Sequence, residues 1–314
     1  MSFLFIACTI FFGLLHIQSY SKTQCKKIRF STIGWTDITA STAIASEILQ
    51  LLGYETKTIN LSLPMTFASL KNNDVDIFLG NWMPTMKADI TPYQNQGLIE
   101  TIGTVLKGAK YTLAVPKYVF DAGVKSFKDL HKHKDKFQGK IYGLEPGNDG
   151  NRIISNIIQG NNFNLKNWKL VESSEQAMLM EVLQSAKRNK WIVFLGWEPH
   201  PMNKMIQISY LTDGDLYFGP HEGGATVYIN SRKNYSKECP EISKFFSNFN
   251  LSIEDEYQMM NMIIDQNISP NIAAKKWIKN NINKVEKFLV NIKKSNSNYI
   301  SIHELKTLIQ KNNY

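Results

Sequence analysis

The segment Asp74–Pro84 (DVDIFLGNWMP) has the pattern of a buried strand that ends in a turn. Val75, Ile77 and Leu79 alternate with Asp74, Asp76 and Phe78, which predicts a mostly buried strand that stops at Gly80 and Asn81. Trp82 is therefore expected at the C-terminal end of the strand, where open α/β sheets bind their ligands. A Trp at this place is a candidate wall for a small ligand, and a Trp that covers the edge of the core is the alternative.

Two other expected strands also lead to a tryptophan. Residues 27–33 (KIRFSTI) alternate as a strand and are followed by Trp35 and Asp37. Residues 191–195 form another apolar run, and Trp197 follows in a turn rich in Gly and Pro. Because expected strands alternate with helices of about ten residues, the sequence predicts an α/β fold with a largely parallel sheet.

The remaining periodic segments predict two α/β units. The other expected strands are residues 54–61, 101–106, 111–116, 140–144, 168–171, 206–211 and 225–229. The expected helices are residues 38–52, 64–70, 127–137, 153–158, 175–186, 241–249, 253–264 and 271–291.

Short strands near residues 111–118 and 225–230 are expected to cross between the two units and to form a hinge. The second lobe would then be inserted into the first, with the ligand in the cleft between them. The expected boundaries are residues 26–115 plus 226–290 for lobe 1 and residues 116–225 for lobe 2. Residues 291–314 are expected to form a polar C-terminal extension, to which we assign no role.

The chain begins with an apolar segment typical of a secretory signal peptide. Residues 3–17 are almost wholly apolar and small residues follow, so we expect cleavage after residue 21 and export to the periplasm. No later segment reaches the roughly 18 consecutive apolar residues that a membrane span needs. The mature protein is therefore expected to be soluble.

Cleavage would remove Cys8 and leave Cys25 and Cys239. An even pair of cysteines in an oxidising compartment predicts a disulfide. Both cysteines have Lys, Glu or Pro neighbours typical of a surface, which favours the disulfide over two unpaired buried thiols.

The formal net charge of +9 comes mostly from lysines scattered among asparagines. A nucleic-acid-binding protein usually concentrates its basic residues on one face or carries a known motif. We therefore expect solvated surface lysines and no nucleic-acid partner.

A polar turn, residues 145–150 (EPGNDG), precedes the helical pattern that starts near Ile153. Asn148 and the backbone N–H groups of this turn can face a ligand. The turn lacks the GxxxxGK[ST] pattern of a phosphate loop, and its acidic side chains would repel phosphate.

Four aromatic residues fall at the ends of expected strands: Trp35, Trp82, Tyr111 and Trp197. In a two-lobed fold they could converge on the cleft and enclose a quaternary ammonium group. Each desolvated cation–π contact contributes roughly 2 kcal/mol. Core packing is the alternative, as expected for the three tryptophans inside apolar periodic segments, Trp168, Trp191 and Trp277.

Six short motifs occur in a characteristic order: GWTD at 34–37, GNWMP at 80–84, YTLAVP at 111–116, PGND at 146–149, GWEPHPM at 196–202 and AAKKWIKNN at 273–281. Together they resemble the substrate-binding proteins of ABC importers for choline and glycine betaine, most closely the periplasmic choline-binding type. The resemblance covers about residues 26–290. It implies a two-lobed, type II binding fold that closes over its ligand and delivers it to a membrane permease.

The resemblance also implies roles for individual residues. The family's aromatic box matches Trp35, Trp82, Tyr111 and Trp197, and its polar contacts match Asp37 and Asn148. The family supports pairing of Cys25 with Cys239. We expect a monomer with no cofactor and no metal site.

Choline is the expected ligand. It is a net cation, so a negative charge from Asp37 beside the aromatic rings suits it, and Asn148 could bond its hydroxyl. Glycine betaine carries a carboxylate that would need donors, and the motifs at strand ends supply no Arg or Lys for it. Backbone N–H groups of residues 147–150 could serve instead, so glycine betaine stays an alternative, and trimethylamine N-oxide is a third candidate.

Two other classes of function remain as alternatives. Glu198 with His200, and His221 with Glu222, could act as acid/base pairs or metal ligands of an enzyme. Neither pair has the HExxH spacing on a helix, and no GxSxG motif is present, so no enzyme is expected. A sensory binding protein that reports its ligand to a membrane receptor, without transport, is the second alternative.

Overall fold

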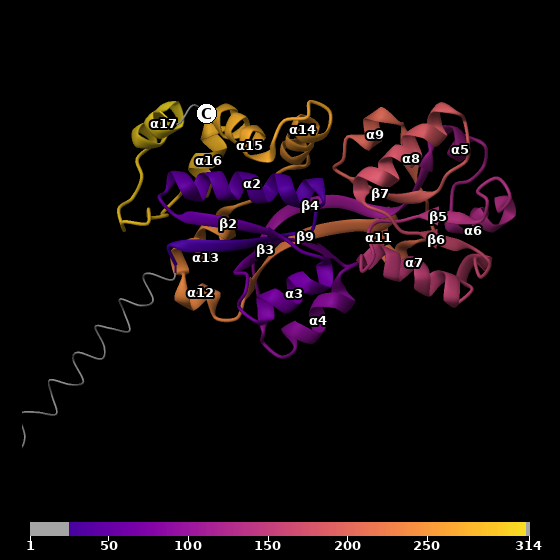
Figure 1. Cartoon of the computed structure of the whole chain (residues 1–314), viewed down its shortest axis with the longest axis horizontal. Coiled ribbons are helices and arrows are strands. Elements are labelled where there is room, and N and C mark those ends of the chain that lie inside the picture. Colours follow the sequence, from indigo (N-terminus) through magenta and orange to yellow (C-terminus); the bar gives the residue numbers. More distant parts are fainter. Residues whose placement is uncertain (1–24, 312–314) are drawn as a thin grey trace, which may run out of the picture.

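The computed structural model describes residues 25–311, which form two lobes side by side (Figure 1). One mixed sheet runs through both lobes in the order β2-β1-β3-β9-β4-β7-β5-β6, and β8 pairs with β4. The strands are β1 Lys27–Thr32, β2 Glu55–Asn60, β3 Ile77–Met83, β4 Ile99–Pro116, β5 Lys140–Tyr142, β6 Lys169–Val171, β7 Phe194–Glu198, β8 Ile208–Tyr210 and β9 Gly224–Arg232. The predicted α/β class is confirmed.

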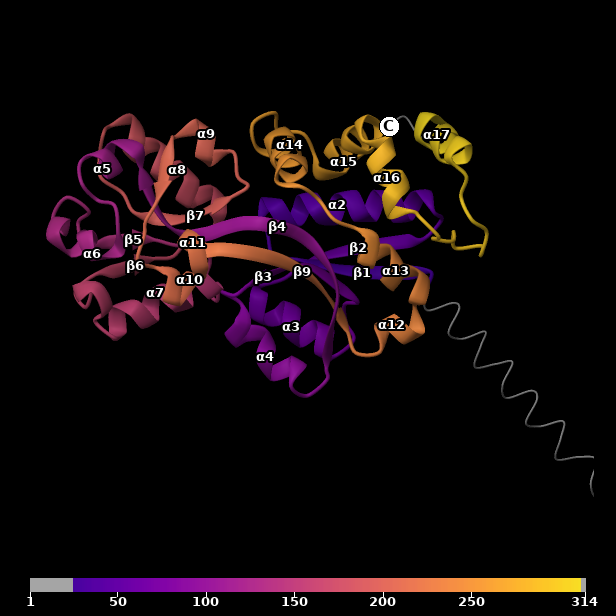
Figure 2. The ribbon, with the colours of Figure 1, turned by 180° about the vertical axis from the view of Figure 1, so that it is seen from behind.

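Strand direction differs between the interior of each lobe and the connection between lobes. β1 is parallel to β2 and β3, and β5 is parallel to β6 and β7. β9 is antiparallel to β3 and β4, and β4 is antiparallel to β7. The predicted parallel pairing therefore holds within each lobe but is wrong for the two long strands β4 and β9, which run from one lobe into the other (Figure 2).

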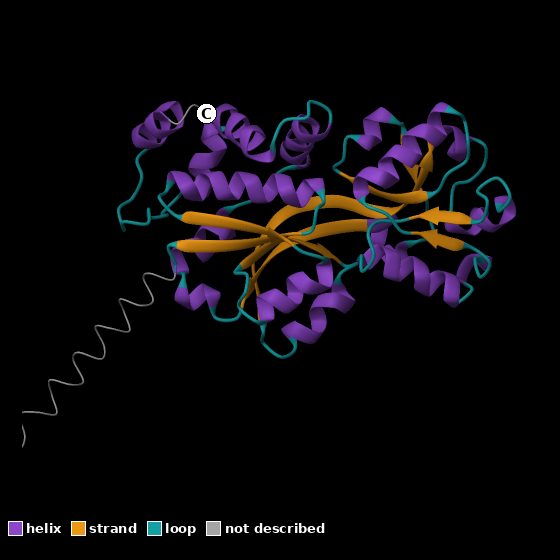
Figure 3. Ribbon diagram, viewed as in Figure 1, coloured by secondary structure: helices purple, strands orange, loops and turns teal. Residues whose placement is uncertain are grey.

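The first lobe contains β1, β2 and β3, with helices on both faces of the sheet (Figure 3). α2 lies on one face, where it contacts α14, α15 and α17, while α3 and α4 pack together on the other. The helices of this lobe are α2 Thr36–Leu51, α3 Leu63–Lys71, α4 Lys87–Gln94, α12 Tyr235–Glu238, α13 Pro240–Asn248, α14 Ile253–Ile264, α15 Pro270–Asn280, α16 Ile282–Phe288 and α17 Ile302–Lys311.

The second lobe surrounds β5, β6 and β7 with helices. α8 and α7 lie on opposite sides of these strands (Figure 1). The elements of this lobe are α5 Lys117–Asp121, α6 Phe127–Leu130, α7 Asp149–Gln159, α8 Glu175–Lys187, α9 Met202–Met205, α10 Asp215–Phe218, α11 Pro220–Gly223 and two 3-10 turns at His131–His133 and Asn162–Asn164.

Residues 99–116 form one continuous strand, β4, although the sequence predicts two strands over 101–106 and 111–116. β9 pairs with β4 from Ile99 to Lys110, and β7 takes over from Lys110 to Ala114, so partners are present along nearly the whole length. Register shifts along the β4–β9 pair let the long strands bend. The predicted lobe boundaries at residues 116 and 226 fall near the ends of β4 and β9, and the division itself stays a prediction.

The strand that contains Trp82 begins and ends later than predicted: it starts at Ile77 and not at Asp74. β3 continues past Gly80 to Met83, because β9 supplies an antiparallel partner on both sides of a register shift between Phe78 and Asn81. A Cβ atom at Gly80 would lie 2.1 Å from Ile38 Cδ1. Gly80 therefore permits close approach of α2 to the strand and does not end it.

Two helices are shorter in the structure than the sequence pattern predicts. The helix expected at 127–137 ends at Leu130 and is followed only by a 3-10 turn, because the lysine-rich remainder supplies no further apolar face. The helix expected at 271–291 breaks at Asn281, whose side chain donates to the carbonyl oxygen of Trp277 at 2.8 Å.

The C-terminal extension is not merely polar. Within it, α17 buries Leu305 and Ile309 and contacts α2 of the first lobe. The salt bridge between Lys294 and Glu304 further holds it to the preceding loop.

Cys25 and Cys239 form the predicted disulfide, with a Cα–Cα distance of 5.5 Å. It joins the residues just before β1 to those just before α13. The predicted signal peptide, residues 1–21, lies outside the described residues. Between residues 25 and 311, no helix combines the length and apolar character needed to cross a membrane.

Candidate functional site

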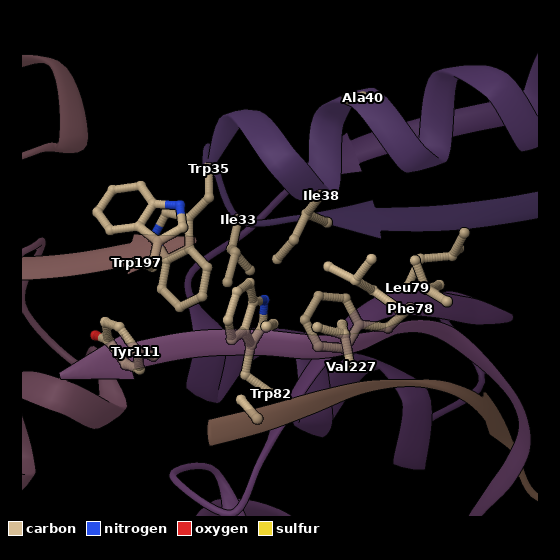
Figure 4. Packing of buried hydrophobic residues seen from close by; sticks show 14 of the residues in the cluster. Ile33, Trp35, Ile38, Ala40, Phe78, Leu79, Trp82, Tyr111, Trp197 and Val227 are labelled. Carbon is tan, nitrogen blue, oxygen red and sulfur yellow. The ribbon is translucent and has the colours of Figure 1, made fainter. Parts of the chain in front are cut away.

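Four aromatic side chains face one small cavity between the lobes (Figure 4). They are the four predicted from the sequence, Trp35, Trp82, Tyr111 and Trp197, and each is only 3–5% exposed. Asp37 and Leu144 complete the lining of the cavity. Its free space is small, because the centre of a water molecule has only about 10 Å³ in it, roughly the room that one water molecule needs.

The rings of this aromatic cage come from four different elements. Trp35 is the residue before α2, and Trp82 lies near the end of β3. Tyr111 in β4 pairs directly with Trp197 in β7 across the antiparallel ladder. The expected strands stop just before Trp82 and Trp197, whereas in the structure both residues belong to strands, near the C-terminal ends of β3 and β7. The predicted convergence of the four rings on one space is confirmed.

Asp37 is the charged side chain in the wall of the cage, and it is 3% exposed. Its Oδ2 accepts a hydrogen bond from Trp82 Nε1 at 3.0 Å, whereas its Oδ1 has no partner among the described residues. Burial, and then the nearby Glu175 carboxylate, raise the pKa of Asp37 to about 7, although the Trp82 hydrogen bond opposes this. An unbonded carboxylate oxygen in a dry site favours a cationic ligand.

Asn148 lies behind the cage and is not part of the cavity lining. It caps α7, and its Oδ1 accepts hydrogen bonds from Tyr111 Oη at 3.1 Å and from the backbone N–H of Asn151 at 2.9 Å. Its buried Nδ2 has no partner within residues 25–311. The structure therefore gives Asn148 a role in holding the Tyr111 ring, and a direct contact with a ligand stays a prediction.

Several residues near the cage carry no obvious signal in the sequence. Leu144 lines the cavity. Both carboxylate oxygens of Glu145 accept from Trp35 Nε1 at 3.0 Å, and burial raises the pKa of this acid. Glu145 is visible in the sequence only as an acid beside the PGND motif, and nothing in that pattern connects it with Trp35.

His200 does not pair with Glu198 as an enzyme would require. It is 1% exposed, its Nε2 lies 3.3 Å from Glu175 Oε1, and its ring packs on Trp197 at a centroid distance of 4.6 Å. Glu222, the partner considered for His221, instead forms a salt bridge with Lys110. His200 is thus held by buried neighbours, and Glu222 is engaged by Lys110 and not by the exposed His221.

Among residues 25–311, no Lys or Arg lines the cage. Arg152 in α7 is a cation that bridges the lobes, and its Nη2 donates to Asp89 at 2.6 Å and to the carbonyl oxygen of Thr85 at 3.1 Å. These contacts hold the Arg152 side chain against α4 and the turn before it. A ligand carboxylate in the cage would therefore have to rely on backbone or neutral donors.

Comparison with known proteins identifies the family. Residues 26–280 match the family model described as the substrate binding domain of ABC-type glycine betaine transport systems. A solved ABC-transporter choline-binding protein in complex with choline is 47% identical, covers 91% of this chain and 99% of its own, and superposes with a TM-score of 0.89. Its unliganded semi-closed form has the same identity and coverage and a lower TM-score of 0.83.

A lactococcal protein of known structure extends the comparison to glycine betaine. In its closed form with glycine betaine it is 30% identical, covers 83% of this chain and 98% of its own, and has a TM-score of 0.76. These proteins confirm the two-lobed periplasmic-binding fold, and the family binds solutes for ABC transporters and is not a class of enzymes. The chain belongs to the family of substrate-binding domains of ABC-type glycine betaine transport systems.

Proposed function

We propose that this protein captures choline in the aromatic cage and delivers it to the permease of an ABC importer. The observation that carries the proposal is the buried Asp37 carboxylate, which shares the cavity with four aromatic rings and has one oxygen without a partner in the described part of the chain. A quaternary ammonium group cannot donate a hydrogen bond, so ring faces and a nearby negative charge are the interactions open to it.

The strength of the cage follows from its rings. Each desolvated cation–π contact contributes about 2 kcal/mol, and losses from ordering and desolvation offset part of the sum. Four rings with a carboxylate therefore support binding at about micromolar dissociation constants. Asn148 would contribute its Nδ2 to the ligand hydroxyl while its Oδ1 holds Tyr111.

Charge supports choline over glycine betaine. Choline carries a net positive charge beside Asp37, whereas the carboxylate of glycine betaine would add a second negative charge without a lining cation to neutralise it. The higher identity to a choline-binding protein than to a glycine betaine complex, 47% against 30%, supports the same ligand. Glycine betaine and trimethylamine N-oxide are the alternative ligands.

Closure of two lobes over the ligand is part of the proposal. Trp35, Asp37 and Trp82 belong to the first lobe, while Trp197 belongs to the second, so only the closed form completes the cage. We place the division at residues 26–115 plus 226–290 for one lobe and residues 116–225 for the other. The mature protein would work in the periplasm as a monomer after removal of residues 1–21.

Isothermal titration of the purified mature protein with choline, glycine betaine and trimethylamine N-oxide, run in parallel, tests the proposal. We expect choline to bind most tightly. Tighter binding of glycine betaine would overturn the role of Asp37, and absence of heat from all three ligands would overturn the proposed function. Uptake of labelled choline by cells that lack the protein separates transport from sensing, because a purely sensory protein would leave uptake unchanged.

A further inference from the structure

A buried carboxylate of the second lobe caps a helix of the first lobe. Glu175, the first residue of α8, is 2% exposed. Its Oε2 accepts from the backbone N–H of Thr36 at 2.9 Å, and its Oε1 accepts from Thr36 Oγ1 at 2.6 Å. Thr36 begins α2, and the preceding Trp35 provides no side-chain cap of its own. Since the first N–H groups of a helix lack partners within it, Glu175 supplies this cap from the other lobe.

His200 connects this cap to the cage. Its Nδ1 accepts from the backbone N–H of Met202 at 3.0 Å, so the ring proton lies on Nε2 and points to Glu175 Oε1, 3.3 Å away. The same ring packs against Trp197. A continuous chain of contacts therefore runs from a cage ring of the second lobe, through His200 and Glu175, to Thr36 of the first lobe.

The capped residue lies between two members of the cage. Thr36 is flanked by Trp35 and Asp37, which both line the cavity. A second carboxylate from the second lobe, Glu145, accepts the Trp35 indole N–H. Glu145 and Glu175 of the second lobe thus hold residues 35–37 of the first lobe, which would present the Trp35 ring and the Asp37 charge to the ligand. Both contacts exist only while the two lobes are together.

We infer that Glu175 is a positioning residue that clasps the two lobes and holds the cage closed without touching the ligand; this rests on the proposed function and on the proposed division into lobes. The greater similarity of the chain to the choline-bound form than to the semi-closed form of a relative accords with contacts of a closed state. When the lobes separate, water replaces these partners, so the net effect of the clasp is moderate, about tenfold in affinity.

Four variants separate a clasp from other roles. Glu175→Ala removes both acceptors, and Glu175→Gln keeps the shape and one acceptor in case the alanine variant folds poorly. Thr36→Val removes one hydrogen bond and leaves the Glu175 charge in place. Glu181→Ala, an exposed acid on the same helix, is the matched control. A role of Glu175 as a charge alone would leave choline affinity unchanged in Thr36→Val.

The experiment measures the distance between spin labels in each lobe, with and without choline, alongside choline titration. Labels are attached through Lys57→Cys and Lys187→Cys, two exposed positions, with the native disulfide intact. We expect both Glu175 variants to shift the ligand-free distances to larger values and to weaken choline binding, about tenfold for alanine and less for glutamine. Thr36→Val should weaken it several-fold, and Glu181→Ala should match the unsubstituted protein.

Unchanged distances in both Glu175 variants would overturn the clasp, whatever happens to affinity. A fall in affinity without a change in distance would assign Glu175 an electrostatic role and would also contradict the inference. If the unsubstituted protein binds no choline, the proposed function fails, while the ligand-free distances still decide whether Glu175 holds the lobes together.

Discussion

The indole N–H of Trp82 donates to Asp37 Oδ2 at 3.0 Å, so one ring of the cage and the acid beside it are held as a unit. The same contact leaves Asp37 Oδ1 without a partner among the described residues. Trp82 is therefore more than a ring face, because it orients the carboxylate to which we assign the proposed discrimination between cationic and zwitterionic ligands.

Asp37→Asn tests that discrimination. The amide keeps a carbonyl oxygen for Trp82 but removes the negative charge, so we expect choline affinity to fall by about tenfold or more. Glycine betaine should lose little or gain affinity. Titration calorimetry with both ligands measures the ratio, and Asp135→Asn, at an exposed position, is the control. Equal losses for the two ligands would contradict the selective role of Asp37.

Choline binding should depend on pH through the same residue. Burial raises the pKa of Asp37 to about 7, and Glu175 nearby adds to the effect. Below this pH the ligand-free site is increasingly protonated and neutral, so affinity should fall as pH drops from 8 to 5. Asp37→Asn should flatten this part of the profile. Asp149, whose pKa burial also raises to about 7, still titrates in that variant. A profile unchanged by the substitution would assign the dependence to another group.

The stability of the ligand-free protein should show the opposite trend. The pKa of Asp37 is higher in the folded protein than its ordinary value of 3.8, so the folded state binds more protons between about pH 4 and pH 7. Stability contributed by this group therefore decreases as pH rises through that window. Urea unfolding at pH 5 and pH 8 should show Asp37→Asn gaining more than about 1 kcal/mol relative to the unsubstituted protein at the higher pH. If the free energies of unfolding of the two proteins differ by the same amount at pH 5 and at pH 8, the raised pKa of Asp37 would be contradicted.

Trp82→Leu removes the aromatic face and the indole donor to Asp37 together, and it keeps apolar packing at this position. Truncation to alanine would leave a cavity at a buried position and cost stability, whereas leucine retains apolar contact but has no π face. Loss of one desolvated cation–π contact, about 2 kcal/mol, corresponds to roughly 30-fold weaker choline binding. Trp168→Leu, a buried tryptophan outside the cage, should lower the melting temperature and leave affinity near its original value. Similar affinity losses in both variants would point to a general packing defect.

Loss of the disulfide should affect stability and spare binding. The bond joins residues 214 positions apart, and such a long loop gives a large loss of entropy in the unfolded chain. Cys25→Ser with Cys239→Ser should lower the free energy of unfolding by about 2–5 kcal/mol in denaturant titrations. Choline affinity should stay within about twofold, because Cys25 precedes β1 whereas Trp35 follows its far end. Unchanged stability would contradict the contribution of the bond to the fold.

Local sequence patterns were sufficient to predict most of the fold and the four rings of the cage. The alternating residues 27–33 and the helical spacing of 38–52 both correspond to elements in the structure, β1 and α2. The four rings could be grouped because aromatic residues beside strand ends share a distinctive context. The length of β3 and β4 could not be read in the same way, because it depends on β9, a partner more than 100 residues away in the chain.

The acidic residues around the cage likewise include one that the sequence indicates and one that only the structure reveals. Asp37 stands near a tryptophan in a recognisable motif, so its place beside the aromatic rings could be predicted. Glu175 begins an ordinary amphipathic helix, and its contact with Thr36 spans 139 residues of sequence. Only the packing of the lobes brings these two residues together, so a helix cap supplied from another lobe has no local signature.

A crystal structure of the mature protein with choline tests the central claim most directly. We predict the trimethylammonium group between Trp35, Trp82, Tyr111 and Trp197, with its nitrogen within about 6 Å of the ring centroids. Asp37 Oδ1 should face the bound cation. Choline bound outside this cavity, or inside it with the ammonium group turned away from the rings, would contradict the account.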